Sequence, residues 1–390
     1  MVKLSKLVIL LAFLGALLSL AITGYDKPAV DKVVSDAALY DQLDNFGEAI
    51  GILRAEYVDP VDSTKLIHGA MKGMLSSLDE YSQFLEKSEY EELESDAAGE
   101  FGGLGVEVST KDGTLTVIAP IDGSPADMAG IKPSDKIIKI DKATTEGMSI
   151  NEAVEKMRGD PGTMVILTIW REKYEKVFDV PLRRAMVKIK SLKKVELLGG
   201  GVGYIKLVEF QSNTPDDLDK ALKDLDKRGM KALVLDLRNN PGGLLEKASD
   251  VAERFLSKDT VIVSIKSRLP GENDVFKSSG KFTVKNYPLV VLVNGGSASA
   301  SEVVAGAIQD NKRGVILGAK TFGKASVQTV APLEDGSAVR FTSAYYYTPG
   351  GRLIKKDGIV PDVAIGSNGA GDEQLEAAVK YLEKLKGDAK

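Results

Sequence analysis

The sequence contains no cysteine and only one histidine among its 390 residues. The absence of cysteine excludes disulfides, thiol nucleophiles and thiolate metal sites. With His68 as the single imidazole, a zinc site would have to be built almost entirely from carboxylates, which that metal disfavours. We therefore expect neither a metal nor a cofactor. His68 itself lies in a helix-like segment, KLIHGAMKGMLSSL, where an ordinary surface or partly buried histidine is expected.

A basic stripe is also missing. The formal net charge is -5, and charged residues of both signs are spread evenly along the chain, so nucleic acid is not expected as a partner. The length allows two or three domains, each with its own hydrophobic core.

Residues 1–24, MVKLSKLVILLAFLGALLSLAITG, have the pattern of an export signal. Lys3 and Lys6 provide a positive start, residues 7–18 are apolar, and residues 19–21 (SLA) match a small-x-small cleavage site. We expect an exported, extracytoplasmic or periplasmic protein, with this segment either cleaved or kept as an inner-membrane anchor.

Composition and expected secondary structure change three times along the rest of the chain. Residues 25–98 are charged and have a helical period, whereas residues 99–184 contain a glycine cluster and β-branched runs that predict a small β-rich module. In residues 185–366 strands alternate with helices, which indicates an α/β domain. Residues 367–390 form a linker and a last helix, and its apolar stripe must cover another element. That stripe consists of Leu375, Val379, Leu382 and Leu385.

Three serines alternate in NGGSASASE, residues 294–302, between an apolar run and an amphipathic one. A strand, a turn and a helix in this order place a serine at a helix N-terminus, where backbone amides and the helix dipole favour a developing anion. One of the serines is therefore a candidate nucleophile. The same residues also fit a capping box, with Glu302 three positions after Ser299, in which serine is only a cap.

A serine nucleophile needs a base, and with histidine almost excluded the remaining candidate is a lysine whose pKa is lowered by burial. Lys324 lies in the stretch VILGAKTFGKASVQTVAPL and is followed by no charged residue before Glu334. Gln328, four positions later, returns to the same side in a strand or a helix and can orient the amine. A solvated lysine at a turn is the alternative.

The oxyanion of a tetrahedral intermediate needs hydrogen-bond donors. DLRNNPGGLL, residues 236–245, reads as a strand end and a tight turn before a helix. We expect the backbone amides of Gly242, Gly243 and Ala300 to serve as donors. An ordinary strand-to-helix turn is again the alternative.

Several motifs, taken in order, resemble one family: DLRNNPGG, NGGSASASEVVAGAIQDN, GAKTFGKASVQ and YYYTPGGRLIKKDGIVPDV. They are similar to those of the carboxyl-terminal processing peptidases, the exported S41-type serine peptidases with a PDZ domain. The resemblance extends from about residue 43 to residue 365. It implies a crotonase/ClpP-like α/β peptidase core, an inserted β-rich PDZ domain and an N-terminal helical region.

The resemblance also implies roles for single residues. Ser299, the middle serine of its run, matches the nucleophile; Lys324 matches the general base, and Gln328 matches the residue that orients the base. Ala325 stands where the family usually has glycine, and DEYS replaces the more frequent DPHS.

The glycine cluster gains an interpretation from the same family. Gly103, Leu104, Gly105 and Val106 resemble the PDZ loop whose backbone amides bind a peptide carboxylate. An apolar pocket beside the loop is expected from Leu104 and Val106. Arg158, at the end of the following helix, is a candidate regulatory contact between the PDZ module and the peptidase domain, or else a solvated arginine.

The predicted function is an exported serine endopeptidase that binds substrate proteins or peptides by their C-termini and cleaves them. It is expected to form a homodimer, as the family often does. The main alternative is a catalytically silent PDZ scaffold that binds peptides. A crotonase-type enzyme acting on acyl-CoA would explain the α/β units, although it would not explain the export signal.

Overall fold

The protein is described by a computed structural model that covers residues 37–111, 113–269, 271–281, 285–354, 357–366 and 372–387. The predicted signal peptide or anchor, residues 1–24, lies outside this part of the chain. Across the ranges given, no helix is both long enough and apolar enough to cross a membrane.

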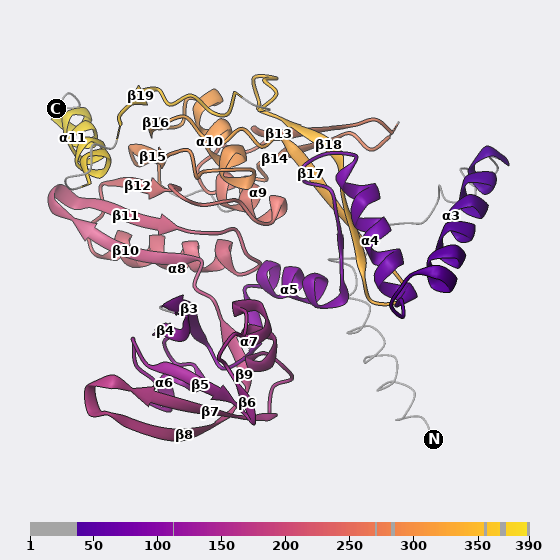
Figure 1. Ribbon diagram of the computed structural model, residues 1–390. Helices are drawn as coiled ribbons and strands as arrows, with labels where there is room; N and C mark the ends of the chain where they lie inside the picture. The colour runs from indigo at the N-terminus through magenta and orange to yellow at the C-terminus, as the bar shows by residue number, and fades with distance from the viewer. Residues whose placement is uncertain are drawn as a thin grey trace, which may run out of the picture. The chain divides into compact units, whose positions relative to one another are not determined.

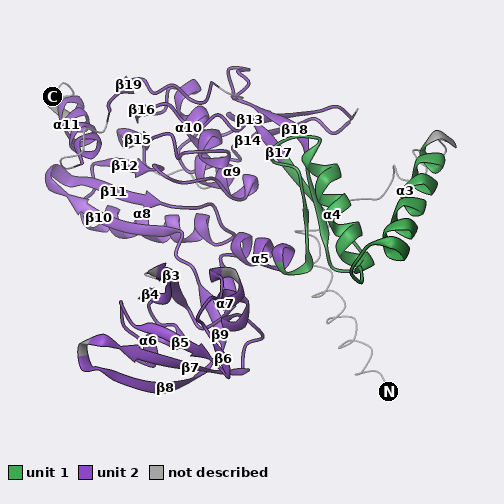
Figure 2. Ribbon diagram, viewed as in Figure 1, with its two compact units in different colours: residues 1–88, 328–341 green, residues 89–327, 342–390 purple. Residues whose placement is uncertain are grey.

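The chain divides into two compact units (Figure 2). The first contains residues 1–88 and 328–341, and the second contains residues 89–327 and 342–390. Two strands, β17 (Ser326–Pro332) and β18 (Ala338–Tyr347), contribute residues to both units.

The first unit has the predicted N-terminal helices. Its elements are α3 (Ala37–Glu56), α4 (Ser63–Ser76) and β1 (Gln83–Leu85), and β1 pairs antiparallel with the start of β18. The half-buried ring of His68, on α4, lies 4.9 Å from the ring of Phe84 between centroids. His68 is thus a packing residue of this unit, as its sequence context predicted.

The second unit contains the β-rich module, a sheet with the strand order β3-β4-β5-β7-β8 and β6 beside β5. Side chains alternate along β7, with Val165, Leu167 and Ile169 buried and Met164 and Ile166 exposed, as expected for a sheet with one covered face. The elements are β3 (Val106–Lys111), β4 (Thr114–Pro120), α6 (Pro125–Met128), β5 (Lys136–Ile140), β6 (Ala143–Thr144), α7 (Ile150–Met157), β7 (Met164–Arg171), the 3-10 turn η1 (Glu172–Tyr174) and β8 (Lys176–Arg183).

A short two-stranded ribbon joins this module to the rest of the unit. It consists of β2 (Glu100–Gly103) and β9 (Ala185–Lys188), which pair antiparallel. Before it lies α5 (Lys87–Ala98), whose residues from 89 onward belong to the second unit.

The α/β core is a six-stranded sheet in the order β10-β11-β12-β15-β16-β19 (Figure 1). In this sheet β11, β12, β15, β16 and β19 run parallel to one another, and β10 is an edge strand that pairs antiparallel with β11. The strands are β10 (Leu192–Leu198), β11 (Val202–Leu207), β12 (Ala232–Asp236), β15 (Leu289–Val293), β16 (Val315–Gly318) and β19 (Val363–Ala364), and the 3-10 turn η2 (Gly199–Gly201) follows β10.

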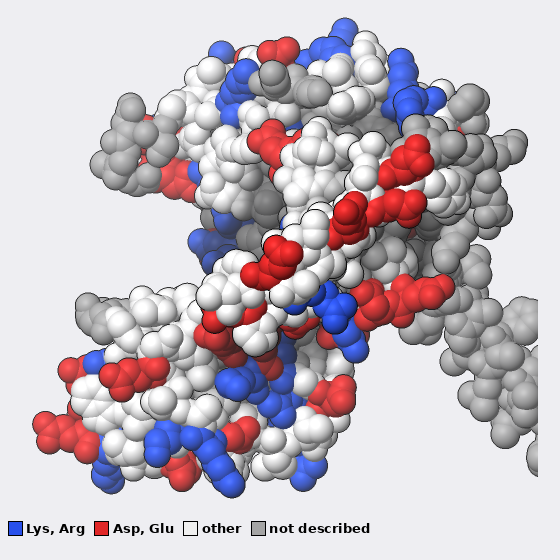
Figure 3. Space-filling view, turned by 45° about the vertical axis from the view of Figure 1, so that its right-hand side comes forward, with Lys and Arg blue, Asp and Glu red and all other residues white. Residues whose placement is uncertain are grey.

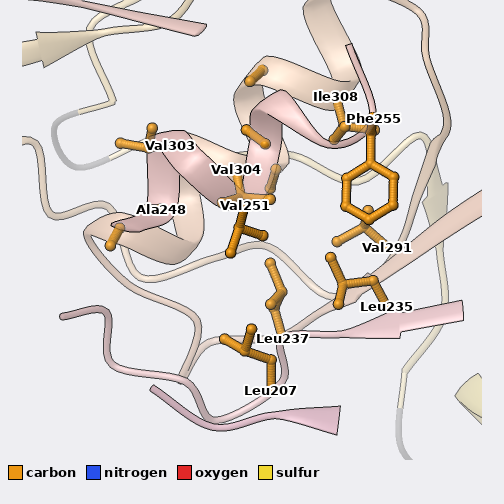
Figure 4. Packing of buried hydrophobic residues seen from close by; sticks show 14 of the residues in the cluster. Leu207, Leu235, Leu237, Ala248, Val251, Phe255, Val291, Val303, Val304 and Ile308 are labelled. Atoms are coloured by element: carbon orange, nitrogen blue, oxygen red, sulfur yellow. The ribbon is translucent and has the colours of Figure 1, made fainter. Parts of the chain in front are cut away.

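Helices cover both faces of this sheet because its central strands are apolar on both sides. Leu235 and Val291 face α8 (Thr214–Lys227), α9 (Leu245–Glu253) and α10 (Ala300–Asp310) in one cluster, and Figure 4 shows Val251, Phe255 and Val304 packed above them. The alternate residues of the strands face α11 (Glu373–Gly387), where Leu382 is fully buried. Leu375, Val379 and Leu382 of the predicted stripe therefore cover the second face of the sheet, whereas Leu385 is exposed.

A further set of strands completes the unit. β13 (Val261–Ser267) pairs antiparallel with β14 (Asp274–Lys277) and with residues 344–347 of β18. On the face seen in Figure 3, acidic and basic side chains are interspersed, in agreement with the even charge distribution of the sequence.

Candidate active site

The candidate nucleophile lies where the buried strand β15 turns into α10. Ser299 is the residue before the helix and has φ 53° and ψ −115°. A positive φ is uncommon for serine, so the surrounding structure must hold this turn in place. Asn294 contributes to that: its side-chain oxygen accepts hydrogen bonds from the amides of Gly296 and Asn239, at 3.0 and 2.9 Å.

The three serines of the turn have different environments. Ser297 and Ser301 are fully buried, and their hydroxyls donate to the backbone carbonyls of Leu237 at 2.8 Å and Asn240 at 2.9 Å. Ser299 lies between them and is partly exposed. The outer serines thus fasten the turn to the loop after β12, and among the three only the middle one is not buried.

Glu302, in the first turn of α10, connects the nucleophile to the loop that carries the candidate base. One carboxylate oxygen accepts hydrogen bonds from the backbone amides of both Ser299 and Lys324, each at 2.9 Å. The other accepts from the Thr321 hydroxyl at 2.5 Å and from the Gly323 amide at 2.8 Å. One fully buried side chain therefore fixes the two candidate catalytic residues relative to each other.

The pKa of Glu302 reflects two opposed effects. Burial raises it above the ordinary glutamate value, while the hydrogen bonds from Thr321, Gly323, Lys324 and Ser299 oppose that rise. All four groups act as donors, since the Thr321 hydroxyl itself accepts from the Ile359 amide at 2.6 Å. An ionised carboxylate satisfies every one of them.

Lys324 is partly buried and lies just before β17. The next residue, Ala325, accepts a hydrogen bond from the backbone amide of Tyr346 on β18 at 2.8 Å. Gln328, which the family motif assigns to orienting the base, lies on β17 four residues later, within the segment that belongs to the first unit.

The loop after β12 lies directly against the nucleophile turn. A Cβ atom added to Gly242 would lie 3.0 Å from the Ser299 Cβ and 3.2 Å from the Ala300 nitrogen, and the φ of Gly242 is +121°. Only glycine allows this approach. The Gly242 amide itself donates to the Asn240 side chain at 2.9 Å.

The backbone amides of Gly243 and Ala300, unlike that of Gly242, are not engaged by an acceptor among the described residues. Gly243 is exposed, and its amide makes no hydrogen bond within the described part of the chain. The same holds, among the residues that the structure covers, for the amide of Ala300 at the start of α10. The Ala300 amide directly follows Ser299 in the chain, and the Gly243 amide directly follows Gly242, the loop residue that approaches Ser299.

A buried ionic network lies behind this loop, which the sequence reasoning missed. Asp236 is fully buried and accepts from Arg238 at 2.6 Å and from the Tyr204 hydroxyl at 2.8 Å. Arg238 also donates to Asp372, just before α11, at 2.6 Å. Burial favours the neutral form of Asp236, yet the hydrogen bonds and charge of Arg238 lower its pKa. The DLR sequence at a strand end was the available signal, but its partner is 134 residues away.

A second missed residue is Tyr346, which is almost fully buried on β18. Burial raises the pKa of its phenol to about 12, and the Ser299 side chain opposes that rise. The three consecutive tyrosines at positions 345–347 carried no hint of which one would be buried.

The predicted carboxylate loop of the β-rich module has an open backbone. The carbonyls of Leu104 and Gly105 accept from the amides of Ala126 and Ile121, at 2.9 and 2.8 Å, whereas their own amides donate no hydrogen bond within the described ranges. Gly105 has a φ of +70°, and an added Cβ would lie 2.3 Å from the Cβ of Ser124. The loop thus depends on glycine and presents free donors.

One detail of this loop corrects the sequence analysis. The side chain of Leu104 is only 1% exposed and belongs to the core of the module, so it does not line an accessible pocket. Val106 is partly buried and packs against the same core. Burial of an apolar side chain in the core of the module is favoured over its exposure in a pocket.

Arg158, at the C-terminal cap of α7, is not a solvated arginine. It pairs with Glu92 at 3.3 Å and Asp96 at 3.9 Å on α5, and it stands over the Phe101 ring at 5.0 Å. Burial raises the pKa of Asp96 above its ordinary value, and the positive charge of Arg158 opposes that rise. The contact therefore joins the β-rich module to α5.

Within the described ranges, no group of three or more His, Cys, Asp or Glu side chains is placed to hold a metal ion.

The α/β sheet is covered on both faces and has a partly exposed serine at a strand-to-helix turn, and a PDZ-like sheet precedes it in the chain. This combination is typical of a PDZ-containing serine peptidase.

The chain belongs to the carboxy-terminal processing peptidases of peptidase family S41. The model of that family matches residues 201–365, a PDZ domain model matches residues 116–171, and the N-terminal domain of the activating protease CtpB matches residues 23–89. The predictions of the family, of the fold class and of a peptidase are confirmed.

Two relatives illustrate the similarity. The carboxy-terminal-processing protease of Bartonella bacilliformis is 43% identical over 333 residues, covering 84% of this chain and 75% of the relative. The carboxy-terminal processing protease CtpA of Bacillus subtilis is 35% identical over 362 residues, covering 93% of this chain and 76% of the relative.

Two solved structures are also similar. The photosystem II D1 C-terminal processing protease aligns with a TM-score of 0.50 and 32% identity, covering 86% of this chain and 96% of that one. A putative S41 protease from Bacteroides fragilis aligns with a TM-score of 0.51 and 18% identity over 86% of this chain and 97% of that one, and it supports the fold alone.

Proposed function

We propose that this carboxy-terminal processing peptidase is an exported endopeptidase in which Ser299 is the nucleophile, Lys324 the general base and Gln328 the residue that orients the base. Its PDZ module, residues 99–184, would bind the C-terminus of the substrate, and its core, residues 185–366, would cleave. Residues 1–24 would direct export, residues 25–98 would be the N-terminal helical region, and residues 367–390 would be the C-terminal linker and helix.

One observation carries the catalytic part of the proposal. The buried carboxylate of Glu302 accepts from the amides of Ser299 and Lys324 through the same oxygen. Charge-assisted hydrogen bonds of this kind are stronger than neutral ones, and a buried carboxylate has no water to exchange them with. The arrangement favours a nucleophile and a base that hold a constant separation, which general-base catalysis requires.

The reaction follows from these groups. Neutral Lys324 takes the proton of the Ser299 hydroxyl while the Oγ lone pair forms a bond to the scissile carbonyl carbon, and the carbonyl π electrons move to its oxygen. When the tetrahedral intermediate collapses, the C–N bond breaks and the Lys324 ammonium gives its proton to the departing amine. Water then attacks the acyl-enzyme by the same route.

The negative oxygen of the intermediate would be held by the amides of Gly243 and Ala300. Both are unoccupied by other acceptors within the described residues, and Ala300 opens α10, whose N-terminal dipole favours an anion. We no longer include Gly242 among the donors, because its amide is already directed at Asn240. Its role would be to let the loop approach Ser299.

The PDZ module would capture a free α-carboxylate with the amides of its loop, residues 103–106. The free amides of Leu104 and Gly105 support this role. Arg158 would act as a regulatory contact: a Cβ added to Gly103 would lie 3.6 Å from the Arg158 Cα, so occupancy of the loop can influence the pair between Arg158 and α5.

We further propose a homodimer, with the N-terminal helices as the contact. Along α3 several large apolar side chains are exposed, among them Leu43, Phe46 and Ile52. Such a row is more often covered by a partner than left in water. Anchoring of the exported protein in the membrane would depend on residues 1–24.

The decisive experiment is active-site labelling. Purified wild type and the variants Ser299→Ala, Ser297→Ala and Ser301→Ala would react with a fluorophosphonate probe, and the modified peptide would be identified by mass spectrometry. We expect labelling at residue 299 in all chains except Ser299→Ala. Folded wild-type protein that cleaves a protein substrate without being labelled there would contradict the proposal, and a chain with peptide binding but no cleavage would support the scaffold alternative.

A further inference from the structure

Asn240 is fully buried in the loop after β12, and both ends of its side-chain amide are hydrogen-bonded. Its Oδ1 accepts from the backbone amide of Gly242 at 2.9 Å, and its Nδ2 donates to the carbonyl of Leu207 at 3.1 Å. Its backbone carbonyl accepts from the Ala298 amide at 3.0 Å and from the Ser301 hydroxyl at 2.9 Å. The side chain thus holds the glycine loop, and the main chain holds the turn that carries the candidate nucleophile.

The peptide group between Gly242 and Gly243 decides where the Gly243 amide points. This peptide bond is trans, and the Gly242 carbonyl accepts a hydrogen bond from the Phe210 amide at 2.8 Å. In a trans peptide group the N–H and the C=O point in opposite directions, so the Gly243 N–H is directed away from Phe210. The amide has no acceptor within the described residues, as an oxyanion donor requires before the substrate binds.

Two consecutive glycines do not hold this orientation by themselves. The φ angles of Gly242 and Gly243 are +121° and +126°, and neither residue has a Cβ that would resist rotation of the peptide group between them. A half-turn of that group would place a carbonyl oxygen where the N–H now points, and a carbonyl repels a developing oxyanion. The loop therefore depends on restraints from other residues.

Asn240 provides such a restraint at the preceding peptide group. The bond from the Gly242 amide to its Oδ1 closes an Asx-turn, in which an asparagine side chain accepts from the amide two residues later. Pro241, between them, has a fixed φ and no N–H that could compete. An Asx-turn is by itself a common turn, but here its asparagine is also bonded to the end of β11 and to the nucleophile turn.

We propose that Asn240 is a positioning residue whose side chain holds the loop so that the Gly243 N–H faces the oxyanion of the tetrahedral intermediate. It contacts neither the substrate nor the reacting atoms and acts through Gly243. This inference rests on the proposed function, in which Ser299 is the nucleophile, and adds to it the residue that orients an oxyanion donor.

The test compares Asn240→Ala with Asn240→Ser. Both variants lose the donor to Leu207, but a serine hydroxyl can still accept, more weakly, from the amide two residues later. Asn240→Ala should lower kcat about 10- to 100-fold and leave KM within about twofold, because the oxyanion donor acts on the transition state. Asn240→Ser should be at least about threefold faster than Asn240→Ala, because it can keep the turn.

A transition-state analogue distinguishes positioning from a general loosening of the fold. A peptide boronic acid with the sequence of the reporter substrate forms a tetrahedral adduct with the nucleophilic serine, and one oxygen of that adduct takes the place of the oxyanion. Its affinity for Asn240→Ala should fall by the same factor as kcat. The midpoint of the pH–rate profile should not move, because Lys324 is unchanged.

Asn311→Ala is the matched control for lost stability. Asn311, at the C-terminal cap of α10, is partly buried, and its Nδ2 donates to the carbonyls of Val261 at 3.0 Å and Ala307 at 2.8 Å. Its replacement also removes two hydrogen bonds of a side-chain amide, so both alanine variants should melt below the wild type. Asn311→Ala should nevertheless keep kcat and the affinity for the boronic acid within about twofold.

The outcomes separate this inference from the proposed function. A wild-type kcat in Asn240→Ala, equal kcat values for the alanine and serine variants, or a loss that appears in KM alone would overturn the inference and leave Ser299 as nucleophile. If Asn240→Ala did not fold, Asn240→Ser would decide: a lowered kcat at unchanged KM is expected, and a wild-type kcat would exclude the role. If instead Ser299→Ala cleaved the reporter and the wild type were labelled at another residue, the proposed function itself would fail.

Discussion

The turn around Ser299 and the PDZ loop, residues 103–106, are both expected to bind an anion through backbone amides, and they are built differently. The catalytic turn is held by buried polar side chains that reach it from distant segments, among them Glu302, Asn294 and Ser301. The PDZ loop is held by glycine conformations, by an apolar core that includes Leu104 and by hydrogen bonds that its own backbone carbonyls accept.

The difference corresponds to two tasks. A nucleophile and base must keep their separation within a fraction of an ångström, and directional hydrogen bonds to a buried carboxylate provide that precision. A loop that binds C-termini needs free donors, and here the hydrogen bonds within the module engage the carbonyls of Leu104 and Gly105 and leave their amides available. Substitutions in the two regions should therefore have different consequences.

The largest effect is expected for Ser299→Ala and Lys324→Ala. Each should lower kcat by at least about 1,000-fold with unchanged folding, and the double variant should be no worse, since the two residues act as a unit. Turnover of a protein substrate and a melting curve would measure this.

The flanking serines serve as the comparison. Ser297→Ala and Ser301→Ala should remain active but lose about 1–3 kcal/mol of stability each, because a buried carbonyl loses its donor. A Ser297→Ala variant that is inactive at an unchanged melting temperature would contradict the assignment of the nucleophile.

Glu302→Gln should have the next largest effect. The amide keeps the shape of the carboxylate but directs a donor at groups that are themselves donors, so kcat should fall about 100-fold and stability by about 2–4 kcal/mol. Glu246→Gln, an exposed glutamate in the first turn of α9, is the control. If the two variants had the same kcat, the proposal that Glu302 fixes the nucleophile relative to the base would be contradicted.

The PDZ loop should discriminate between free and blocked C-termini. In the Ser299→Ala background, a peptide ending in an apolar residue should bind about 10- to 100-fold more tightly as the free acid than as the amide, because amidation removes charge-assisted hydrogen bonds. Fluorescence anisotropy would measure both affinities.

Two glycine substitutions would sharpen that measurement. Gly105→Ala should abolish the discrimination, since its Cβ would meet Ser124. Gly113→Ala, in the same module at a similar φ of +71° with open space around it, should keep the discrimination. Identical affinities for the acid and the amide in the parent protein would exclude carboxylate capture.

The smallest effect concerns the ionic network behind the catalytic loop. The hydrogen bond from Arg238 lowers the pKa of Asp372, and Asp236 also has a lowered pKa despite its burial. The stability that they contribute is present above the ordinary carboxylate pKa of about 4 and is lost as the pH falls through their folded values.

Asp372→Asn should therefore lower the melting temperature by about 1–3 °C at pH 7, because the carboxylate is partly exposed and screened. The difference from wild type should shrink progressively as the pH falls below about 4. Asp122→Asn removes a fully exposed pair with Lys190 and should change neither value. A constant difference for Asp372→Asn at both pH values would show that the charge is not responsible.

The sequence predicted the modules well because each carries a local signal. The alternation along residues 164–170, the strand-turn-helix around NGGSASASE and the helix-forming N-terminal region are all readable from short stretches. The glycines at 105 and 242 were also recognisable as positions where backbone must pass closely.

What the sequence could not supply were the partners. Glu302 was recognised only as half of a capping box, and nothing in that spacing indicated that Thr321, Gly323 and Lys324 would donate to the same carboxylate. The pairing of Arg238 with Asp372 likewise joins residues far apart in the chain. Such contacts are set by tertiary packing.

The positive φ of Ser299 sets the stability of the folded protein against its activity. A residue other than glycine at φ 53° with ψ −115° is held against its own preference, at a cost on the order of 1–3 kcal/mol. Ser299→Gly would release that strain and should melt at a higher temperature than the wild type while being inert. The native protein is thus less stable than its inactive Ser299→Gly variant. Serine at this position is explained by activity and not by stability.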